Sequence, residues 1–428
     1  MNLPLRELFS SVFAAAMPPR MTQRKTPDGR DISLLGYGAM RLPTVDGGHA
    51  NPWAEGVSSA DIDFKTLKKQ IHYLFDHGVT LFDTAPAYCR GRSEALLGRA
   101  LEGLPREKYF LSTKLSNFAP QQMSFEASKQ LFEQSLENLR TDYVDFYMIH
   151  NIGQKGWANF ENRFLKNDIL PWLFEQKRKG RIRNLGWSYH GDPRTIEWVL
   201  KKHDDGVYRW DFALIQLNYI DWRHGHETDE KNLNAEDLYN EAVRRGMKVL
   251  VMEPLLGGRL AKHVPAVDEI LTPLDPEATP AKWALRFAGT HPGVMSVLSG
   301  MTYQEHIEEN TAVFSPLKPL SKNEFVALEQ AAEAYLGYGS IPCNLCNYCM
   351  PCPYGLDIPG LLSFRNQVRL DGLRDAKRIL ALYEKCIPDQ RRRADRCIGC
   401  GICNGHCPQH IDIPSEMDEL AAFIEGLR

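Results

Sequence analysis

Residues 134–150 read QSLENLRTDYVDFYMIH, and this stretch contains one complete step of a repeating pattern. Its leucines stand at helical spacing, on a helix for which Ser124 is a suitable N-cap. The run from Tyr143 to His150 is then apolar on both faces, as a buried parallel strand must be. A helix followed by such a strand is the unit of an α/β fold, and this strand ends in a histidine.

The same step repeats on both sides of this stretch. Further helices are predicted to begin near Asp192, Asn234 and Thr279. The predicted strands are 33–40, 79–84, 109–115, 143–150, 182–189, 212–219, 248–255 and 294–301. Eight such units predict an α/β fold of the (β/α)8 TIM-barrel type. An open doubly wound sheet is the alternative, because the same alternation can be laid out flat, and the count of eight favours the barrel.

Composition excludes several classes of protein. The 428 residues hold 51 Lys and Arg against 54 Asp and Glu, so the charge of −3 gives no electrostatic case for binding nucleic acid or an anionic membrane. No apolar run reaches the roughly 18 residues of a membrane span. The short apolar run from Leu8 to Met17 follows Arg6, whose charge Glu7 cancels, so it is a poor secretory signal. We expect a cytoplasmic protein in which residues 1–21 are a flexible extension, or in which the start codon is placed too early.

Four polar residues stand at or just after the ends of three successive predicted strands. The second strand ends in FDTAPAY, with Asp83 at its tip and Tyr88 in the loop, the third ends in LSTK with Lys114, and the fourth ends with His150. Catalytic groups in a TIM barrel project from these strand ends, so the four should converge on one rim. A neighbouring ammonium would lower the pKa of the tyrosine and make it a better proton donor. Proton delivery to an oxygen, together with hydride delivery to its carbon, reduces a carbonyl group.

These motifs, in this order, resemble the aldo/keto reductase family over roughly residues 22–312. That family has a (β/α)8 barrel that binds NADP(H) without a Rossmann fold, and Gly36-Tyr-Gly38 here lacks the third glycine of a Rossmann fingerprint. The resemblance implies that Tyr88 is the proton donor, that Lys114 and Asp83 tune it, and that His150 orients the substrate.

The resemblance also implies a set of cofactor-binding residues. They are Ser188 and Gln216 for the carboxamide of the nicotinamide, Leu255 and Gly257 for the pyrophosphate, and Gly300, Met301, Thr302, Glu309 and Asn310 for the adenosine end. Two positions depart from the family pattern. Met252 stands where many members stack an aromatic ring on the nicotinamide, and His306 stands where NADPH-preferring members have Arg or Lys. The resemblance makes NADP(H) the expected cofactor. Because a neutral imidazole binds phosphate less firmly than a guanidinium does, NAD(H) is the alternative.

Nine of the ten cysteines fall in the last 86 residues, after a predicted linker and helix over 313–340. Two runs, C-x2-C-x2-C-x2-C-P and C-x2-C-x2-C-x3-C-P, follow the pattern of bacterial dicluster ferredoxins, in which the fourth cysteine of each run serves the other cluster. By that rule one [4Fe–4S] cluster takes Cys343, Cys346, Cys349 and Cys407, and the other takes Cys352, Cys397, Cys400 and Cys403. Structural zinc is the alternative, although zinc sites usually use pairs rather than triplets of cysteines. Residues 341–428 are thus predicted to be a ferredoxin-like domain, with Cys89 and Cys386 outside the clusters.

The combined prediction is an NAD(P)H-dependent oxidoreductase that reduces a small aldehyde or ketone and carries two [4Fe–4S] clusters. Hydride carries two electrons and each cluster passes one, so how the two parts communicate stays open. The clusters can be structural or regulatory, or they can exchange electrons with a protein partner. The alternative function is a non-catalytic NADPH or redox sensor whose iron–sulfur domain mediates electron transfer or docking.

Overall fold

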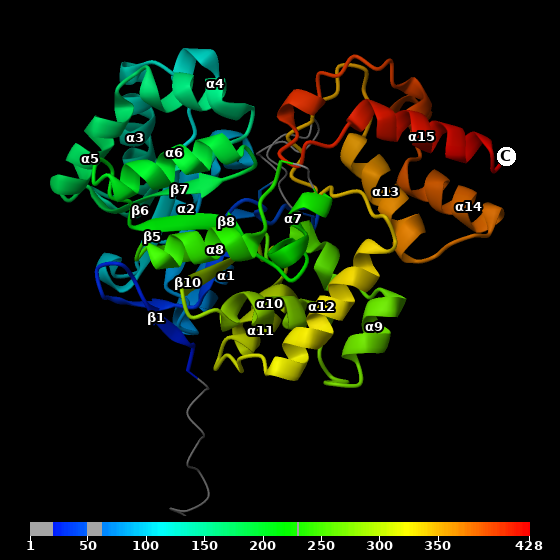
Figure 1. Cartoon of the computed structure of the whole chain (residues 1–428), viewed down its shortest axis with the longest axis horizontal. Coiled ribbons are helices and arrows are strands. Elements are labelled where there is room, and N and C mark those ends of the chain that lie inside the picture. The colour runs from blue at the N-terminus through cyan, green and yellow to red at the C-terminus, as the bar shows by residue number, and fades with distance from the viewer. Residues whose placement is uncertain (1–19, 49–61, 229–230) are drawn as a thin grey trace, which may run out of the picture.

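Eight parallel strands close into a barrel in the computed structural model, which describes residues 20–48, 62–228 and 231–428 (Figure 1). Most of the predicted N-terminal extension, residues 1–19, lies outside this described part. The barrel strands, in chain order, are β3 (Leu35–Gly38), β4 (Leu81–Asp83), β5 (Phe110–Leu115), β6 (Val144–Ile152), β7 (Ile182–Tyr189), β8 (Phe212–Gln216), β9 (Lys248–Met252) and β10 (Val294–Ser299). Because β10 pairs with β3, the sheet has no open edge. The predicted TIM barrel is confirmed, and the open sheet is excluded.

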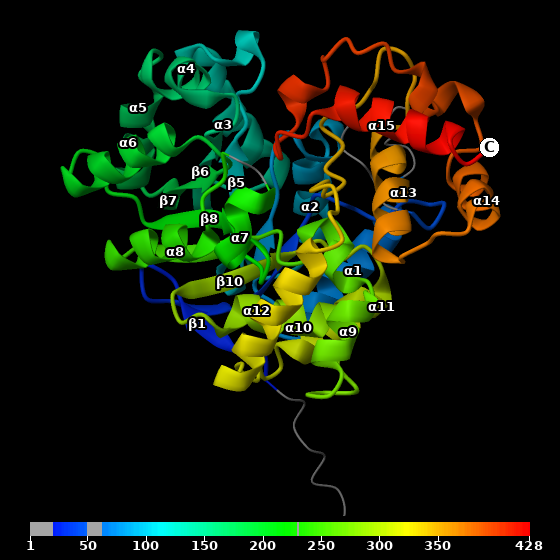
Figure 2. The ribbon, with the colours of Figure 1, turned by 45° about the vertical axis from the view of Figure 1, so that its right-hand side comes forward.

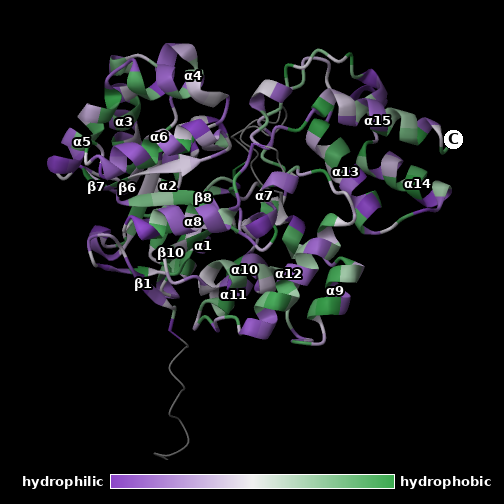
Figure 3. Ribbon diagram, in the orientation of Figure 1, coloured by the Kyte–Doolittle hydropathy of each residue, from purple (hydrophilic) through white to green (hydrophobic). Residues whose placement is uncertain are grey.

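Amphipathic helices surround the barrel, with hydrophilic and hydrophobic residues interleaved along them (Figure 3). They are α1 (Phe64–Asp76), α2 (Ser93–Ala100), α3 (Phe125–Leu139), α4 (Gly156–Phe160), α5 (Ile169–Arg178), α6 (Pro193–Asp204), α7 (Asp221–Thr228), α8 (Ala235–Arg244), α9 (Pro265–Leu271), α10 (Pro280–Thr290), α11 (Gln304–Val313) and α12 (Lys322–Leu336). Three of the predicted helix starts are confirmed with a side-chain cap. Ser124, Asp192 and Thr279 each accept a backbone N–H bond at the start of the helix that follows.

The interior of the barrel is packed with large apolar side chains, which leaves the rim as the place for chemistry. The inner core consists of Ile32, Leu81, Phe110, Phe146, Met148, Phe212, Leu214, Leu250, Met295 and Leu298. Ile32 comes from a small antiparallel hairpin, β1 (Gln23–Lys25) and β2 (Asp31–Ser33), which the sequence pattern did not predict. Its strands have three residues each, too few to show a period.

A second hydrophobic core lies in the C-terminal part, which contains α13 (Ile358–Leu370), α14 (Ala376–Cys386) and α15 (Ile413–Glu425). These three helices lie together beside the barrel in both views (Figures 1 and 2). Helix α12, by contrast, buries Leu328 and Tyr335 in the outer core of the barrel. None of the helices in the described segments is long and apolar enough to cross a membrane.

Candidate active site and cysteine sets

The four polar residues predicted to converge do share one cavity, of about 450 Å3, at the carboxyl ends of the strands. Asp83 is the last residue of β4, Lys114 lies near the end of β5, and His150 lies near the end of β6. Tyr88 begins a short helical turn, Tyr88–Gly91, after β4. Parallel pairing of β4 with β5 and of β5 with β6 brings these side chains together from segments far apart in the chain.

Lys114 and Asp83 form a buried ion pair beneath the tyrosine. The Nζ atom of Lys114 lies 2.6 Å from Oδ1 of Asp83 and donates a second bond to the carbonyl oxygen of Thr84, at 2.7 Å. The hydroxyl of Ser112 donates to the other oxygen of Asp83, also at 2.6 Å. The same ammonium lies 5.0 Å from the centroid of the Tyr88 ring. Both oxygens of Asp83 therefore accept hydrogen bonds, and the ammonium of Lys114 is held close to the tyrosine ring.

The pKa of Tyr88 moves in the direction opposite to the one expected from the sequence. Burial raises the pKa of Tyr88 well above its ordinary value of 10.0, Asp83 and Glu253 raise it further, and Arg41 lowers it. The ammonium of Lys114 does not offset this, because Asp83 already compensates its charge at 2.6 Å. Tyr88 is therefore a neutral phenol at physiological pH, which is the state a proton donor needs.

His150 is held as a neutral imidazole facing Tyr88. Burial lowers the pKa of His150 well below 6.5, and the positive charges of Lys114 and Arg163 lower it further. Its Nδ1 atom lies 2.6 Å from the hydroxyl oxygen of Ser116, and its ring lies edge-on to that of Tyr88 with centroids 6.0 Å apart. The guanidinium of Arg163 donates to the carbonyl oxygen of His150 at 2.6 Å, which fixes the backbone at this strand end. A neutral ring in this position can hydrogen-bond a substrate oxygen.

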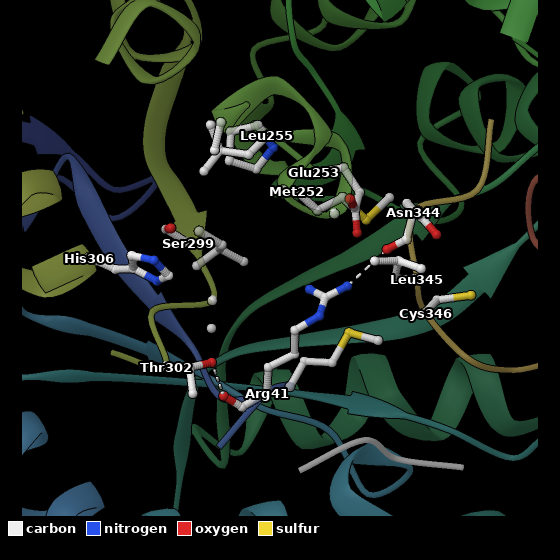
Figure 4. A pocket seen from close by; sticks show the side chains of 18 of the residues that line it. Arg41, Met252, Glu253, Leu255, Ser299, Thr302, His306, Asn344, Leu345 and Cys346 are labelled. Atoms are coloured by element: carbon white, nitrogen blue, oxygen red, sulfur yellow. Dashed lines mark hydrogen bonds between the residues drawn. The ribbon is translucent and has the colours of Figure 1, made fainter. Parts of the chain in front are cut away.

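The residues predicted to bind the cofactor lie along the same cavity, with two exceptions. Those that line it are Ser188, Leu255, Gly257, Gly300, Thr302, Glu309 and Asn310, together with Met252 and His306. Of these, Met252, Leu255, Thr302 and His306 are labelled in Figure 4. Met301 is buried in the outer core and is not among the lining residues. Gln216 ends β8, and its buried Nε2 atom has no hydrogen-bond partner among the described residues.

This side of the cavity fits a nicotinamide nucleotide by its donors and acceptors. The hydroxyl oxygen of Ser188 accepts a bond from the backbone N–H of Asn151 at 2.7 Å, so its own proton is available to a ligand. The unpartnered amide of Gln216 is a second candidate for the carboxamide. Helix α11 begins at Gln304, and no side chain caps its first N–H groups. Such groups are suited to an anion such as a phosphate.

Several cavity residues were missed by sequence reasoning because they lie outside the strand-end motifs. Arg41 follows β3, and Glu253 follows β9 with a positive φ of 53°. Burial raises the pKa of Glu253, against a lowering effect of Arg41. Two others, Asn344 and Tyr348, come from the cysteine-rich part. No local sequence signal marks them, since only the docking of distant segments brings them here.

The eight motif cysteines interact electrostatically within and between their two runs. Burial is the main cause that raises the pKa of Cys343, Cys346 and Cys349, and the charge of Cys407 contributes in all three. Burial likewise raises the pKa of Cys403 to about 11, with contributions from Cys400, Cys397 and Cys352. Cys407 thus interacts with the three cysteines of the first run, Cys352 interacts with Cys403, and Cys349 also interacts with Cys403. Within the described ranges, no three His, Cys, Asp or Glu side chains group as the ligands of a single metal ion.

The donor chemistry of these sets fits iron–sulfur clusters, which are held by four thiolates each. The two cysteines outside the sets differ in surroundings. Cys89 is buried, burial raises its pKa to about 12, and its thiol lies 3.5 Å from the carbonyl oxygen of Met40. Cys386 is exposed at the end of α14. Neither Cys89 nor Cys386 is among the cysteines that interact with the motif thiols described above.

Comparison with known protein families gives two matches, one after the other along the chain. The model described as "Aldo/keto reductase family" matches residues 35–333, and the model described as "4Fe-4S dicluster domain" matches residues 342–412.

Among curated proteins, L-galactose dehydrogenase of Arabidopsis thaliana is 27% identical over 313 residues, which cover 69% of this chain and 88% of that protein. Methylglyoxal reductase YeaE of Escherichia coli is 28% identical over 306 residues, which cover 70% of this chain and 94% of that protein. Among solved structures, an aldo-keto reductase from Klebsiella pneumoniae in complex with NADPH has a TM-score of 0.54 and 21% identity, covering 72% of this chain and 94% of that chain. The holo form of an aldo-keto reductase from Bacillus halodurans has a TM-score of 0.56 and 22% identity, covering 74% and 97%.

Proposed function

The chain belongs to the aldo/keto reductase family, and from this membership we propose that it reduces a small aldehyde or ketone with NADP(H), with Tyr88 as the proton donor. The observation that carries the proposal is the single cavity that Asp83, Tyr88, Lys114 and His150 share with Ser188. The NADPH-bound relative from Klebsiella pneumoniae supports the choice of cofactor. A sensor without catalysis would not require this arrangement, so the alternative function is disfavoured.

In the proposed reaction, bound NADPH supplies a hydride to the carbonyl carbon. The hydroxyl of Tyr88 gives its proton to the carbonyl oxygen, so the carbonyl becomes an alcohol and the tyrosine becomes a phenolate. Arg41, which lowers the pKa of Tyr88, stabilises that phenolate until it regains a proton from water, and Lys114, 5.0 Å from the ring centroid, holds Asp83 beside it. His150, neutral and edge-on to the tyrosine, orients the substrate oxygen. Burial of these groups strengthens each interaction by excluding water.

We also propose two [4Fe–4S] clusters with interleaved ligands, Cys343, Cys346, Cys349 and Cys407 for one and Cys352, Cys397, Cys400 and Cys403 for the other. Such clusters would supply one-electron transfer. An electron-transfer protein as partner stays a prediction, and the exposed Ile398 and Ile402 on either side of the exposed Cys400 are the surface that supports it. Residence in the cytoplasm also stays a prediction.

The test is Tyr88→Phe, with NADPH consumption measured against a panel of small aldehydes and ketones. Loss of a general acid typically costs about 100-fold to 10,000-fold in rate, and we expect a fall in kcat of that size. Circular dichroism, iron content and NADPH affinity should match those of the wild-type protein, since only one hydroxyl is removed. Unchanged carbonyl reduction by a folded Tyr88→Phe protein would overturn the assignment.

A further inference from the structure

Both cysteine runs help to form the wall of the active-site cavity. The contributing residues are Asn344, Leu345, Cys346, Tyr348 and Pro408. Cys346 belongs to the first run, and Pro408 directly follows Cys407, the last cysteine of the second run. Because Cys346 and Cys407 belong to the same proposed ligand set, the two segments bring one and the same set to the cavity.

The two proposed ligand sets differ in their relation to this cavity. We call Cys343, Cys346, Cys349 and Cys407 the inner set, and Cys352, Cys397, Cys400 and Cys403 the outer set. Cys346 is at once a wall residue and a proposed ligand, so no other residue lies between the cavity and the inner set. Among the residues that the structure describes, no member of the outer set lines the cavity.

Cys346 lies toward the end of the cavity that is proposed to bind the nicotinamide. In Figure 4 it lies beside Asn344 and Leu345, on the side of Met252, and His306 lies on the opposite side. By the resemblance described above, Met252 stands at the position of the nicotinamide ring and His306 at the phosphate of the adenosine end. A bound nucleotide would thus bring its nicotinamide, not its adenosine, toward the inner set.

Both wall segments are fixed to the barrel next to a cysteine of the inner set. The guanidinium of Arg41 donates to the carbonyl oxygen of Asn344 at 3.0 Å, and the backbone of Asn344 leaves no room for a Cβ at Gly257. On the second run, the amide of Gln154 donates to the carbonyl oxygen of His406 at 3.2 Å. The inner set is therefore held against the barrel from both runs.

The outer set, by contrast, opens to the solvent. Its Cys400 is exposed between Ile398 and Ile402, whose side chains are 61% and 53% exposed. In the inner set, Cys407 is buried. Reagents in solution should therefore reach the outer set more readily than the inner set.

This asymmetry has an electrostatic consequence. The reduction potential of an iron–sulfur cluster depends on its net charge, on hydrogen bonds to its sulfurs and on its exposure to solvent. A molecule that fills the cavity displaces water from the wall at Cys346 and brings its own charges there. Coulomb interactions weaken with distance, so the effect should be larger on the inner set than on the outer set.

We propose that the inner set forms a redox centre whose potential depends on what occupies the nicotinamide end of the cavity, whereas the outer set forms a centre that is accessible from solvent and independent of the occupant. This inference rests on the proposed clusters and the proposed NADP(H) site, and it adds a regulation of that site. The dependence is reciprocal, so the redox state of the inner set must change the affinity for the nucleotide by the same factor.

The test measures the potentials of both clusters by electron paramagnetic resonance in anaerobic redox titrations of the full-length holoprotein. Titrations are made without ligand and with saturating tetrahydro-NADP, which neither donates nor accepts a hydride. Coupling between two sites typically changes affinity by about five-fold or more, and five-fold corresponds to a shift of about 40 mV for one electron. We expect such a shift for the inner set and none for the outer set. The affinities of the oxidised and the reduced protein for tetrahydro-NADP should differ by the matching factor.

A matched pair of variants assigns the two signals. Cys352→Ala/Cys400→Ala removes two ligands of the outer set, and Cys343→Ala/Cys346→Ala removes two ligands of the inner set. The ligand-dependent signal should persist in the first variant and disappear in the second. Adenosine 2′,5′-bisphosphate, which lacks the nicotinamide, is the control ligand and should leave both potentials unchanged.

Iron release to a chelator gives a second readout in the wild-type protein, which does not depend on the folding of any variant. We expect about half of the iron to leave quickly, from the outer set, and tetrahydro-NADP to slow only the remaining half. Equal shifts of both potentials, no shift with the nucleotide bound, or equal protection of all the iron would overturn the inference. Each of these outcomes leaves the carbonyl reduction intact. A protein that holds its iron but binds no NADPH, or that reduces no carbonyl compound of the panel, would instead overturn the proposed function.

Discussion

The ammonium of Lys114 lies 2.6 Å from the carboxylate of Asp83, and neither side chain is more than 4% exposed. Burial lowers the pKa of Lys114, while Asp83 raises it, so the lysine depends on its partner for its charge. The pair also lies directly below Tyr88, the proposed proton donor. Removal of this ion pair should therefore lower both the stability of the barrel and the proposed reductase activity.

Asp83→Asn should destabilise the barrel, because it leaves the charge of Lys114 buried and uncompensated. Removing one partner of a buried pair costs about 3–5 kcal/mol, and urea unfolding at neutral pH would measure the loss. The double variant Asp83→Asn/Lys114→Met should recover at least part of it, since no charge is then left unpaired. A double variant as unstable as the sum of the single variants would show that the two residues do not act as a pair.

The pH dependence of carbonyl reduction should be flat on the alkaline side. The active form of Tyr88 is the protonated phenol, which exists below its pKa, and burial together with Asp83 and Glu253 holds that pKa well above 10.0. We expect kcat/KM to show no decline from pH 7 to about 10, measured with saturating NADPH. A decline centred near neutral pH would mean that a group other than Tyr88 donates the proton, or that the tyrosine has a lowered pKa.

Iron analysis of paired cysteine variants should reveal the interleaved ligand sets. An anaerobically purified protein with two four-iron clusters holds about eight irons per chain. Cys352→Ala/Cys400→Ala removes two ligands of one predicted set and should leave about four irons. Cys346→Ala/Cys352→Ala affects both sets and should leave few. If each run instead bound its own cluster, the retained iron of the two variants would be reversed.

Gly257 and Gly258 offer a matched pair for the contact between the two parts of the chain. Both have positive φ, 65° and 94°, so alanine strains the backbone at either position. Only at Gly257 would the new Cβ strike Asn344, whereas nothing lies within 4 Å of the one at Gly258. Gly257→Ala should therefore displace the backbone around Asn344 and speed protease cleavage near residues 337–342, well beyond any effect of Gly258→Ala. Equal cleavage rates would place the seam between the two parts elsewhere.

The fold was predictable because each buried parallel strand is an apolar run long enough to see, as in 143–150, which became β6. The positions of Asp83, Lys114 and His150 followed from the rule that strand ends share one rim. Arg41, Glu253 and Tyr348 did not follow, since docking over long sequence separations decides where they lie. The direction of the pKa of Tyr88 was missed for a related reason. A sequence shows that a lysine is near, but it does not show that burial outweighs a charge already paired with Asp83.

The order of the segments along the chain has a consequence for how the protein matures. Residues 344–348 are synthesised after all eight barrel strands, yet they complete the cavity that those strands open. A nascent barrel released from the ribosome ahead of its last 90 or so residues would have an unfinished active site. The first cysteine run, in and beside this segment, is proposed to share both of its clusters with the second run, which is synthesised still later. The proposed metal centres would then be assembled last, after every strand of the barrel has been made.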